Sequence, residues 1–168
     1  MTLNMNNKDI EKWLNESLNE LKSIKKIMRA KTFNNLSPYL VKYAIIRACG
    51  AIEVAFKSIV ADFCDNKTTI QQLNYYIDND IRNSSMNPSM DNLYKMLLKF
   101  DENWNNNFKN QLSQETDRRV WESSLKSLNN ERNKFAHGTL ATTLSINDVI
   151  LYFSDSIKII EIFDNVVQ

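Results

Sequence analysis

Hydrophobic residues recur along this chain at the three- and four-residue spacing of amphipathic helices, and no segment shows the alternation typical of a strand. The spacing predicts a first helix over residues 9–30. A second helix should run from Ser37 to about Asp62, with Ser37 as its N-cap and Pro38 at its first position. Because this second segment is apolar on nearly all sides, we expect it to be one long central apolar helix of a bundle.

Capping residues and apolar stripes predict the remaining helices. The predicted starts are Thr68 or Thr69, Pro88–Ser89, a position between Ser113 and Thr116, and Ser145. Residues 101–107 are polar enough to allow a kink or a loop. The helix before Gly138 should end at that glycine, and Asp148 should lie in the first turn of the last helix.

Composition supports an all-α class. The chain has 168 residues, a net charge of +1 and only two glycines and two prolines, although tight turns usually draw on these residues. All-β folds and Gly-rich dinucleotide folds are therefore disfavoured. We expect a single domain over residues 1–168, built as a bundle of about five to six helices.

The sequence also indicates the cellular compartment and whether a metal or cofactor is expected. The N-terminus is polar, and no apolar run reaches the length of about 18 residues that a membrane span needs. We therefore expect a cytoplasmic protein without membrane contact. Cys49 and Cys64 are read as reduced core thiols, and with the single histidine they cannot form a tetrahedral zinc site. We expect no metal and no cofactor.

The strongest candidates for catalytic residues lie between Glu131 and Gly138. His137 is the only histidine of the chain, and histidine is the side chain that exchanges protons near neutral pH. Arg132 occupies a position where the stripe formed by Leu125, Leu128 and the residues around them calls for an apolar side chain. A guanidinium there is unfavourable unless it is paired or opens onto a polar cleft.

A structural role also fits both residues. A histidine at a helix C-terminus can act as a cap, and an arginine on a mixed stripe can extend to solvent. Five residues separate Arg132 from His137, which places them about 140° apart around a helix. They can meet only if the last turn unwinds at His137-Gly138, or if the arginine of one copy meets the histidine of another.

The segment Arg132-Asn-Lys-Phe-Ala-His137 resembles the Arg-x4–6-His motif of HEPN domains, which usually carry a polar residue, here Asn133, directly after the arginine. The region from Ser37 to His137 is most similar to the RiboL-PSP-HEPN branch found in bacterial defence and toxin loci. This resemblance implies an all-α fold, a homodimer and, in active members, metal-independent cleavage of RNA.

The expected function is that of a metal-independent endoribonuclease of a defence or toxin–antitoxin system. Attack by the 2′-hydroxyl needs a base, an acid and a cation that steadies the phosphorane. His137 suits the first two roles and Arg132 the third, while Asn133 would orient His137 or bind phosphate. Because one chain has one histidine, a two-fold dimer would supply both copies of each group.

Several further residues are candidates for supporting roles. Glu53 lies within the apolar second helix and could pair with Arg132 and hold its guanidinium; alternatively it reaches solvent. Lys134, Lys126 and Arg47 are candidates for a basic rim that binds RNA, to which Arg118 and Arg119 could add. The alternative is that these charges only form a solvated face, as most runs of charged residues do.

Two other functions compete with cleavage. The fold could serve as a catalytically silent module that binds RNA or a protein, or as the partner of a nucleotidyltransferase antitoxin. In toxins of the latter system the motif continues with a tyrosine two residues after the histidine, where this chain has Thr139. An antitoxin or regulatory protein is a further possible partner. We expect the dimer face on the His137 side of the motif helix, flanked by Asn130 and Lys134.

Overall fold

The computed structural model describes residues 3–29, 35–138 and 142–168, and within these ranges the regular structure is helical. Its elements are α1 (Lys8–Arg29), α2 (Ser37–Lys67), α3 (Gln71–Ile77), a π-helical turn (Asp78–Arg82), α4 (Met90–Phe100), α5 (Glu102–Gln114), α6 (Arg118–Ala136) and α7 (Ile146–Val166). The expected all-α class is therefore confirmed. The described residues contain seven α-helices rather than five to six.

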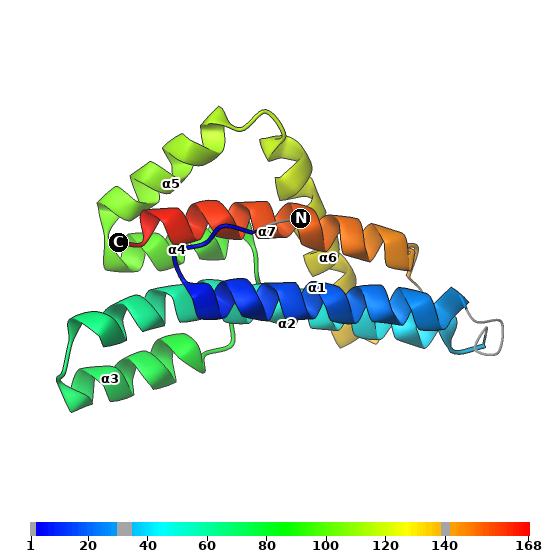
Figure 1. Ribbon diagram of the computed structural model, residues 1–168, viewed down its shortest axis with the longest axis horizontal. Coiled ribbons are helices and arrows are strands. Elements are labelled where there is room, and N and C mark those ends of the chain that lie inside the picture. The colour runs from blue at the N-terminus through cyan, green and yellow to red at the C-terminus, as the bar shows by residue number, and fades with distance from the viewer. Residues whose placement is uncertain (1–2, 30–34, 139–141) are drawn as a thin grey trace.

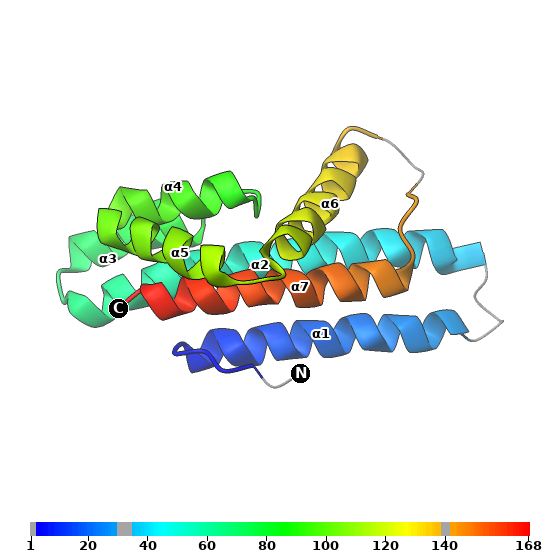
Figure 2. The same ribbon diagram turned by 90° about the horizontal axis from the view of Figure 1, so that it is seen from above.

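Three long helices form the body of the molecule. Helices α1, α2 and α7 run side by side (Figures 1 and 2), and α6 packs across α2 and α7. Figure 2 shows the C-terminal end of α6 standing away from this body. Helices α3, α4 and α5 gather toward the other end, near the C-terminus of the chain. The end of α6 therefore projects from the body of the bundle.

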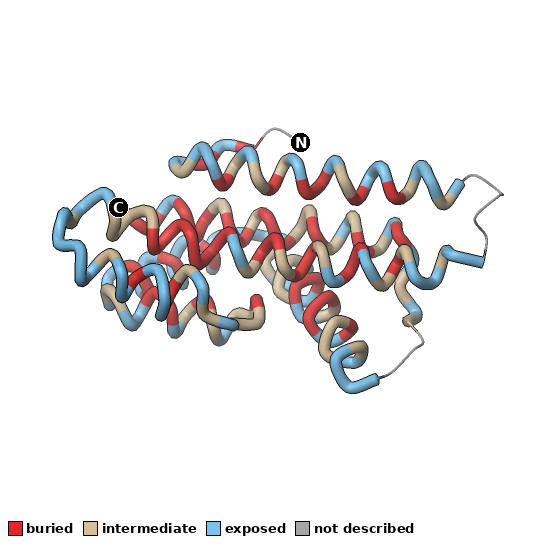
Figure 3. Tube along the Cα trace, turned by 90° about the horizontal axis from the view of Figure 1, so that it is seen from below, coloured by how far each residue is buried: buried red, intermediate tan, exposed pale blue. Residues whose placement is uncertain are grey.

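An aromatic cluster within the core lies where α2, α5 and α7 meet. Buried positions line the facing sides of the long helices in Figure 3. Phe163 makes edge-on contacts with Phe56, at 6.1 Å between ring centres, and with Phe108, at 5.7 Å. All three side chains are fully buried. Each contributes about 1.5–3 kcal/mol through burial, so this cluster fixes how the three helices pack.

Local capping signals place the starts of α4 and α7 correctly. The N-cap of α3 is Ile70 rather than Thr68 or Thr69, and α2 continues to Lys67, past the expected end near Asp62. Ser145 caps α7 in a capping box with Asp148, as expected. Ser37 is instead the first residue of α2, because Leu36 holds the N-cap position and makes no side-chain cap bond. Helix α6 begins at Arg118, after the expected window. The predicted end of the first helix at Ala30 lies outside the described residues.

The break between α4 and α5 accounts for one additional helix. Asp101 ends α4 and also caps α5, accepting a hydrogen bond from the Asn103 backbone at 2.6 Å. Within the polar stretch 101–107, only Asp101 therefore interrupts the helical structure, and the residues after it belong to α5. A carboxylate N-cap satisfies the first free N–H groups of a helix, so no longer loop is needed.

Helix α2 differs from the expected fully enclosed helix. It is 31 residues long, and most residues from Ala44 to Ala61 are buried. Tyr39, Tyr43, Ile46 and Val54, however, are exposed. The expectation of a central helix that is apolar and covered on nearly all sides is therefore not confirmed.

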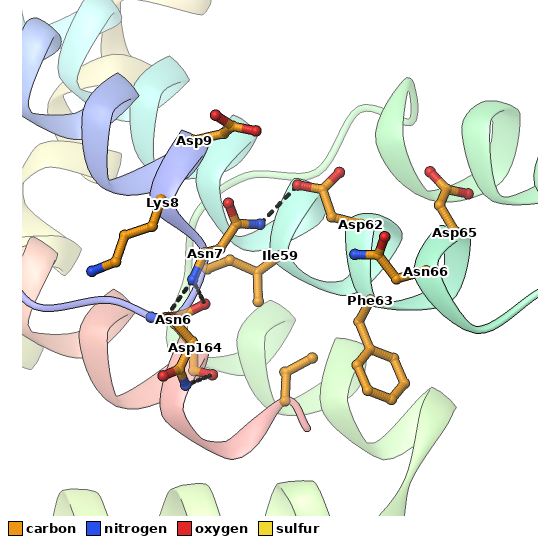
Figure 4. A pocket seen from close by; sticks show the side chains of 11 residues that line it. Asn6, Asn7, Lys8, Asp9, Ile59, Asp62, Phe63, Asp65, Asn66 and Asp164 are labelled. Atoms are coloured by element: carbon orange, nitrogen blue, oxygen red, sulfur yellow. Dashed lines mark hydrogen bonds between the residues drawn. The ribbon is translucent and has the colours of Figure 1, made fainter.

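The N-terminal segment is fastened to α7 by Asp164, which is 2% exposed (Figure 4). Its carboxylate accepts hydrogen bonds from the backbone N–H groups of Asn6 and Asn7. Burial raises the pKa of Asp164, and the two backbone donors oppose that increase. The Asn7 side chain also donates to Asp62 on α2 at 2.8 Å, so the segment joins two long helices.

None of the helices in the described ranges combines the length and the apolar character that crossing a membrane requires.

The two glycines have opposite roles in this framework. Gly138 follows α6 with a φ of 82°, in the left-handed region that suits glycine. Gly50 lies within α2, and a Cβ added there would meet nothing within 4 Å. A side chain therefore strains the backbone at Gly138 and fits without a clash at Gly50.

Substitution by alanine should consequently have opposite signs at the two positions. We expect Gly138→Ala to lower the free energy of unfolding by about 1 kcal/mol, and Gly50→Ala to raise it by about 0.5–1 kcal/mol. Urea denaturation followed by circular dichroism measures both. A stabilising Gly138→Ala would show that the turn after α6 is not left-handed.

Candidate active site

The motif residues lie at the exposed end of α6. The helix remains regular to its last residue, because the His137 backbone N–H still donates to the Asn133 carbonyl at 3.1 Å. His137 is the C-cap, and the chain leaves the helix only at Gly138. The last turn therefore does not unwind, and helical geometry keeps Arg132 and His137 about 140° apart.

Arg132 is held by amides. Its Nη1 donates to Asn87 Oδ1 at 2.6 Å and to Asn133 Oδ1 at 3.3 Å. Asn87 Nδ2 donates to the same Asn133 oxygen at 3.4 Å, which closes a three-residue network. Among the described residues, no carboxylate lies within 4.0 Å of this guanidinium, whereas Arg82 pairs with three. The positive charge of Arg132 is oriented and left uncompensated.

Glu53 does not pair with Arg132, contrary to the expectation from the sequence. Its Oε1 accepts from Lys57 Nζ at 3.1 Å and from the Met86 backbone N–H at 2.8 Å. Lys57 lies one turn further along α2, so it reaches Glu53 without any help from α6. Glu53 therefore acts on the chain segment next to Asn87, and not on the guanidinium itself.

His137 opens onto a pocket of about 520 Å³ between α6 and the segment before α7. The lining residues are Ser127, Asn130, Glu131, Asn133, Lys134, His137, Thr143 and Leu144. Asn133 belongs to this lining and also binds Arg132. The structure thus connects the two sides of α6 through Asn133, although Arg132 itself is not part of the pocket wall.

Glu131 anchors the end of α6. It is 5% exposed and accepts hydrogen bonds from Lys134 Nζ at 2.6 Å and from Thr142 Oγ1 at 2.8 Å. Burial tends to raise the pKa of Glu131, but the two hydrogen bonds and the Lys134 charge together hold it below its usual range. Thr142 precedes α7, so Glu131 links the motif helix to the following segment.

The proposed rim residues differ in their surroundings. Lys126 and Lys134 are exposed on α6, and Lys134 is engaged by Glu131. Arg47 lies at the contact with α1, where it pairs with Glu20 at 2.7 Å and stacks on Trp13 at 4.5 Å. Of the three, only Lys134 therefore lies beside His137 at the end of α6. Lys126 lies about two turns earlier on the helix, beside a different pocket, and Arg47 lies elsewhere.

Sequence reasoning missed Asn87, Lys57 and Lys42. Lys42 lies on α2 with its Nζ 5.6 Å from the centre of the Phe135 ring of α6, which adds a positive charge near the motif. Asn87 precedes Pro88, and such an Asn-Pro pair marks a turn. That signal could have identified a loop there, but not the helix against which it packs.

Cys49 is buried near the charges of Arg132 and Glu53 but makes no hydrogen bond with either. Burial raises the pKa of its thiol to about 12, against the opposing influence of the nearby Arg132 charge. The nearby Glu53 carboxylate raises the pKa further. Since only the thiolate is a good nucleophile, Cys49 is a core residue, as the sequence predicted.

The fold and the site define an all-helical domain with an arginine–histidine motif at the end of its sixth helix. A family model, RiboL-PSP-HEPN, matches residues 12–168. The chain belongs to the RiboL-PSP-HEPN family, whose wider class of HEPN domains is associated with ribonuclease activity and RNA binding. Comparisons with curated proteins and with solved structures found no match.

The Glu131 anchor should make stability depend on pH. Because its pKa is lowered on folding, its contribution is present above the ordinary value of 4.5 and is lost as the pH falls through the lowered value. We expect Glu131→Gln to lower the free energy of unfolding at pH 7 by about 1 kcal/mol. The difference from wild type should shrink below pH 4.5.

Urea denaturation at pH 3 to 7 measures this dependence. Glu115→Gln, at an exposed position before α6, is the matched control and should follow the wild type. A deficit in Glu131→Gln that is constant over the whole range would contradict the lowered pKa.

Proposed function

We propose that this protein is a metal-independent endoribonuclease of a defence or toxin–antitoxin system, with RNA as its substrate and Arg132, His137 and Asn133 in its active site. The observation that carries the proposal is the Arg132 guanidinium, which two amides orient and no carboxylate of the described residues neutralises. Such a fork of N–H donors suits a phosphate, and the only histidine of the chain lies five residues further along, at the end of the same helix.

The chemistry requires only the RNA and these side chains. A base removes the proton from the 2′-hydroxyl, whose oxygen then bonds to the adjacent phosphorus. The bond from phosphorus to the 5′-oxygen breaks, and an acid donates a proton to that oxygen. The products are a 2′,3′-cyclic phosphate and a 5′-hydroxyl. Arg132 stabilises the extra negative charge of the phosphorane. Asn133 orients this guanidinium and also lines the pocket onto which His137 opens.

A second copy of the chain completes the proposed site. Within one chain, the regular end of α6 keeps Arg132 and His137 on different sides of the helix. One imidazole would also have to serve as both base and acid. A two-fold dimer across the His137 side of α6, beside Asn130 and Lys134, would supply two histidines and two arginines to one cleft.

A catalytically silent RNA- or protein-binding module is the second candidate, and the separation of Arg132 from His137 within one chain favours it. It predicts retention of RNA in a gel shift without turnover. A nucleotidyltransferase antitoxin as partner has less support, because Thr139 replaces the tyrosine of that motif. Thr139 lies outside the described residues. An antitoxin or regulatory partner of another kind is compatible with either function.

Cleavage of a labelled RNA in the presence of EDTA tests the proposed activity. We expect Arg132→Ala and His137→Ala each to lower the rate by about 100-fold or more, since each removes a group that acts in the transition state. Arg29→Ala, at an exposed arginine at the end of α1, is the matched control and should cleave like the wild type. Cleavage that requires a divalent ion, or that survives in His137→Ala, would contradict the proposal.

Mixed dimers test the requirement for two copies. When wild-type chains and His137→Ala chains are co-expressed in equal amounts, random pairing leaves about one quarter of dimers with two histidines. We expect the specific activity to fall to about that fraction. A decrease to about one half would show that each chain acts alone. Mixing with Arg29→Ala chains should leave the specific activity unchanged.

A further inference from the structure

We propose that Asn87 is a positioning residue for the Arg132 guanidinium, and that Lys57 and Glu53 of α2 hold the segment that carries it. This inference rests on the proposed function, because it assigns Asn87 a part in binding the same phosphate. Residues 83–89 connect the π-helical turn to α4. They bring Asn87 to a residue of α6 that lies 45 positions further along the chain.

Two side chains of α2 fix the backbone of this segment. Lys57 is only 5% exposed, and its Nζ donates to the Ser84 carbonyl. Glu53 Oε1 accepts from Lys57 Nζ and from the Met86 backbone N–H. The two backbone groups lie on either side of Ser85, so the loop is attached at two points just before Asn87. Because Lys57 is buried and both members of the ion pair are hydrogen-bonded to the loop, the pair favours one geometry of the loop.

The start of α4 fixes the segment from the other side. The Asn87 carbonyl accepts from Asn92 Nδ2 at 2.8 Å, and the Ser89 hydroxyl accepts from the Asn92 backbone N–H at 3.3 Å. The backbone of Asn87 is thus held before and after its own position. Its side chain is free to contact α6, where it bonds to both Arg132 and Asn133.

The amide at Asn87 orients the guanidinium without neutralising it. Arg47 and Arg118 are held by Glu20 and Glu122, and each pair has no net charge. An aspartate at position 87 would have the same shape and would also accept from Arg132, but it would compete with the phosphate for the charge. A neutral amide holds the same geometry and leaves the charge available to an anion. The residue type at this position therefore matters for function as well as for packing.

Two substitutions at Asn87 separate orientation from neutrality. Asn87→Ala removes the acceptor, and we expect kcat to fall about tenfold. Asn87→Asp keeps an acceptor in place but compensates the charge, and we expect kcat to fall about 100-fold. Asn83→Asp adds the same charge at an exposed position of the same segment and should leave kcat unchanged. A merely structural role predicts the opposite order, with Asn87→Asp close to wild type, and that result would overturn the proposal.

Binding of an RNA with a 2′-deoxy residue at the scissile position gives a readout that does not depend on turnover. The logarithm of its affinity falls with the logarithm of salt concentration, by about 0.7 for each phosphate that the protein neutralises on a single strand. We expect Asn87→Asp to reduce this slope by about 0.7 per site, and Asn83→Asp to leave it unchanged. An unchanged slope in Asn87→Asp would overturn the proposal. If the wild type binds this RNA but does not cleave the same RNA with its 2′-hydroxyl intact, the proposed activity fails while this test still decides the role of Asn87.

The attachment of the loop to α2 is tested by replacing both charges of the Glu53–Lys57 ion pair together. Glu53→Met combined with Lys57→Met leaves neither charge unpaired, and such apolar replacements generally preserve folding. We expect this variant to keep the urea midpoint of the wild type while kcat falls about tenfold, as in Asn87→Ala. A folded double variant with wild-type kcat would show that the two residues do not position Asn87.

Discussion

A half-buried guanidinium must be held in place, and the way in which Arg132 is held determines the rest of this site. A carboxylate partner would provide the strongest grip but would also cancel the charge. In this protein the partners are the amides of Asn87 and Asn133, at 2.6 and 3.3 Å from Nη1. This arrangement fixes the direction of the cation and keeps its charge, which are the two properties that recognition of a phosphate requires.

The framework places this cation at an accessible end of the bundle. The C-terminal end of α6 stands away from α1, α2 and α7 (Figure 2), and Gly138 ends the helix just after His137. Glu131 ties this end to the segment before α7, while the ion pair of Glu53 and Lys57 fixes the loop that faces it. A buried pair is weak evidence for stability, so its retention here is better explained by the geometry it gives to Asn87.

Features encoded by neighbouring residues could be predicted from the sequence, and features that depend on distant contacts could not. The capping box of Ser145 with Asp148 and the helix end at Gly138 are local, and both were found. Glu53 was expected to reach Arg132, although Lys57 lies only four residues away and is the nearer partner. The contact of Asn87 with Arg132 joins residues 45 positions apart, and no local pattern encodes which loop meets α6.

The central claim is that the uncompensated guanidinium of Arg132 binds a phosphate of RNA. Nitrogen-15 NMR of the arginine side chains, with Arg132→Ala used for assignment, follows this group directly during titration with an uncleavable 2′-deoxy-substituted RNA in EDTA. The account predicts that the Arg132 signal shifts and saturates together with RNA binding, while the signal of the Glu20-paired Arg47 stays in place. RNA binding that leaves the Arg132 signal unmoved would contradict it.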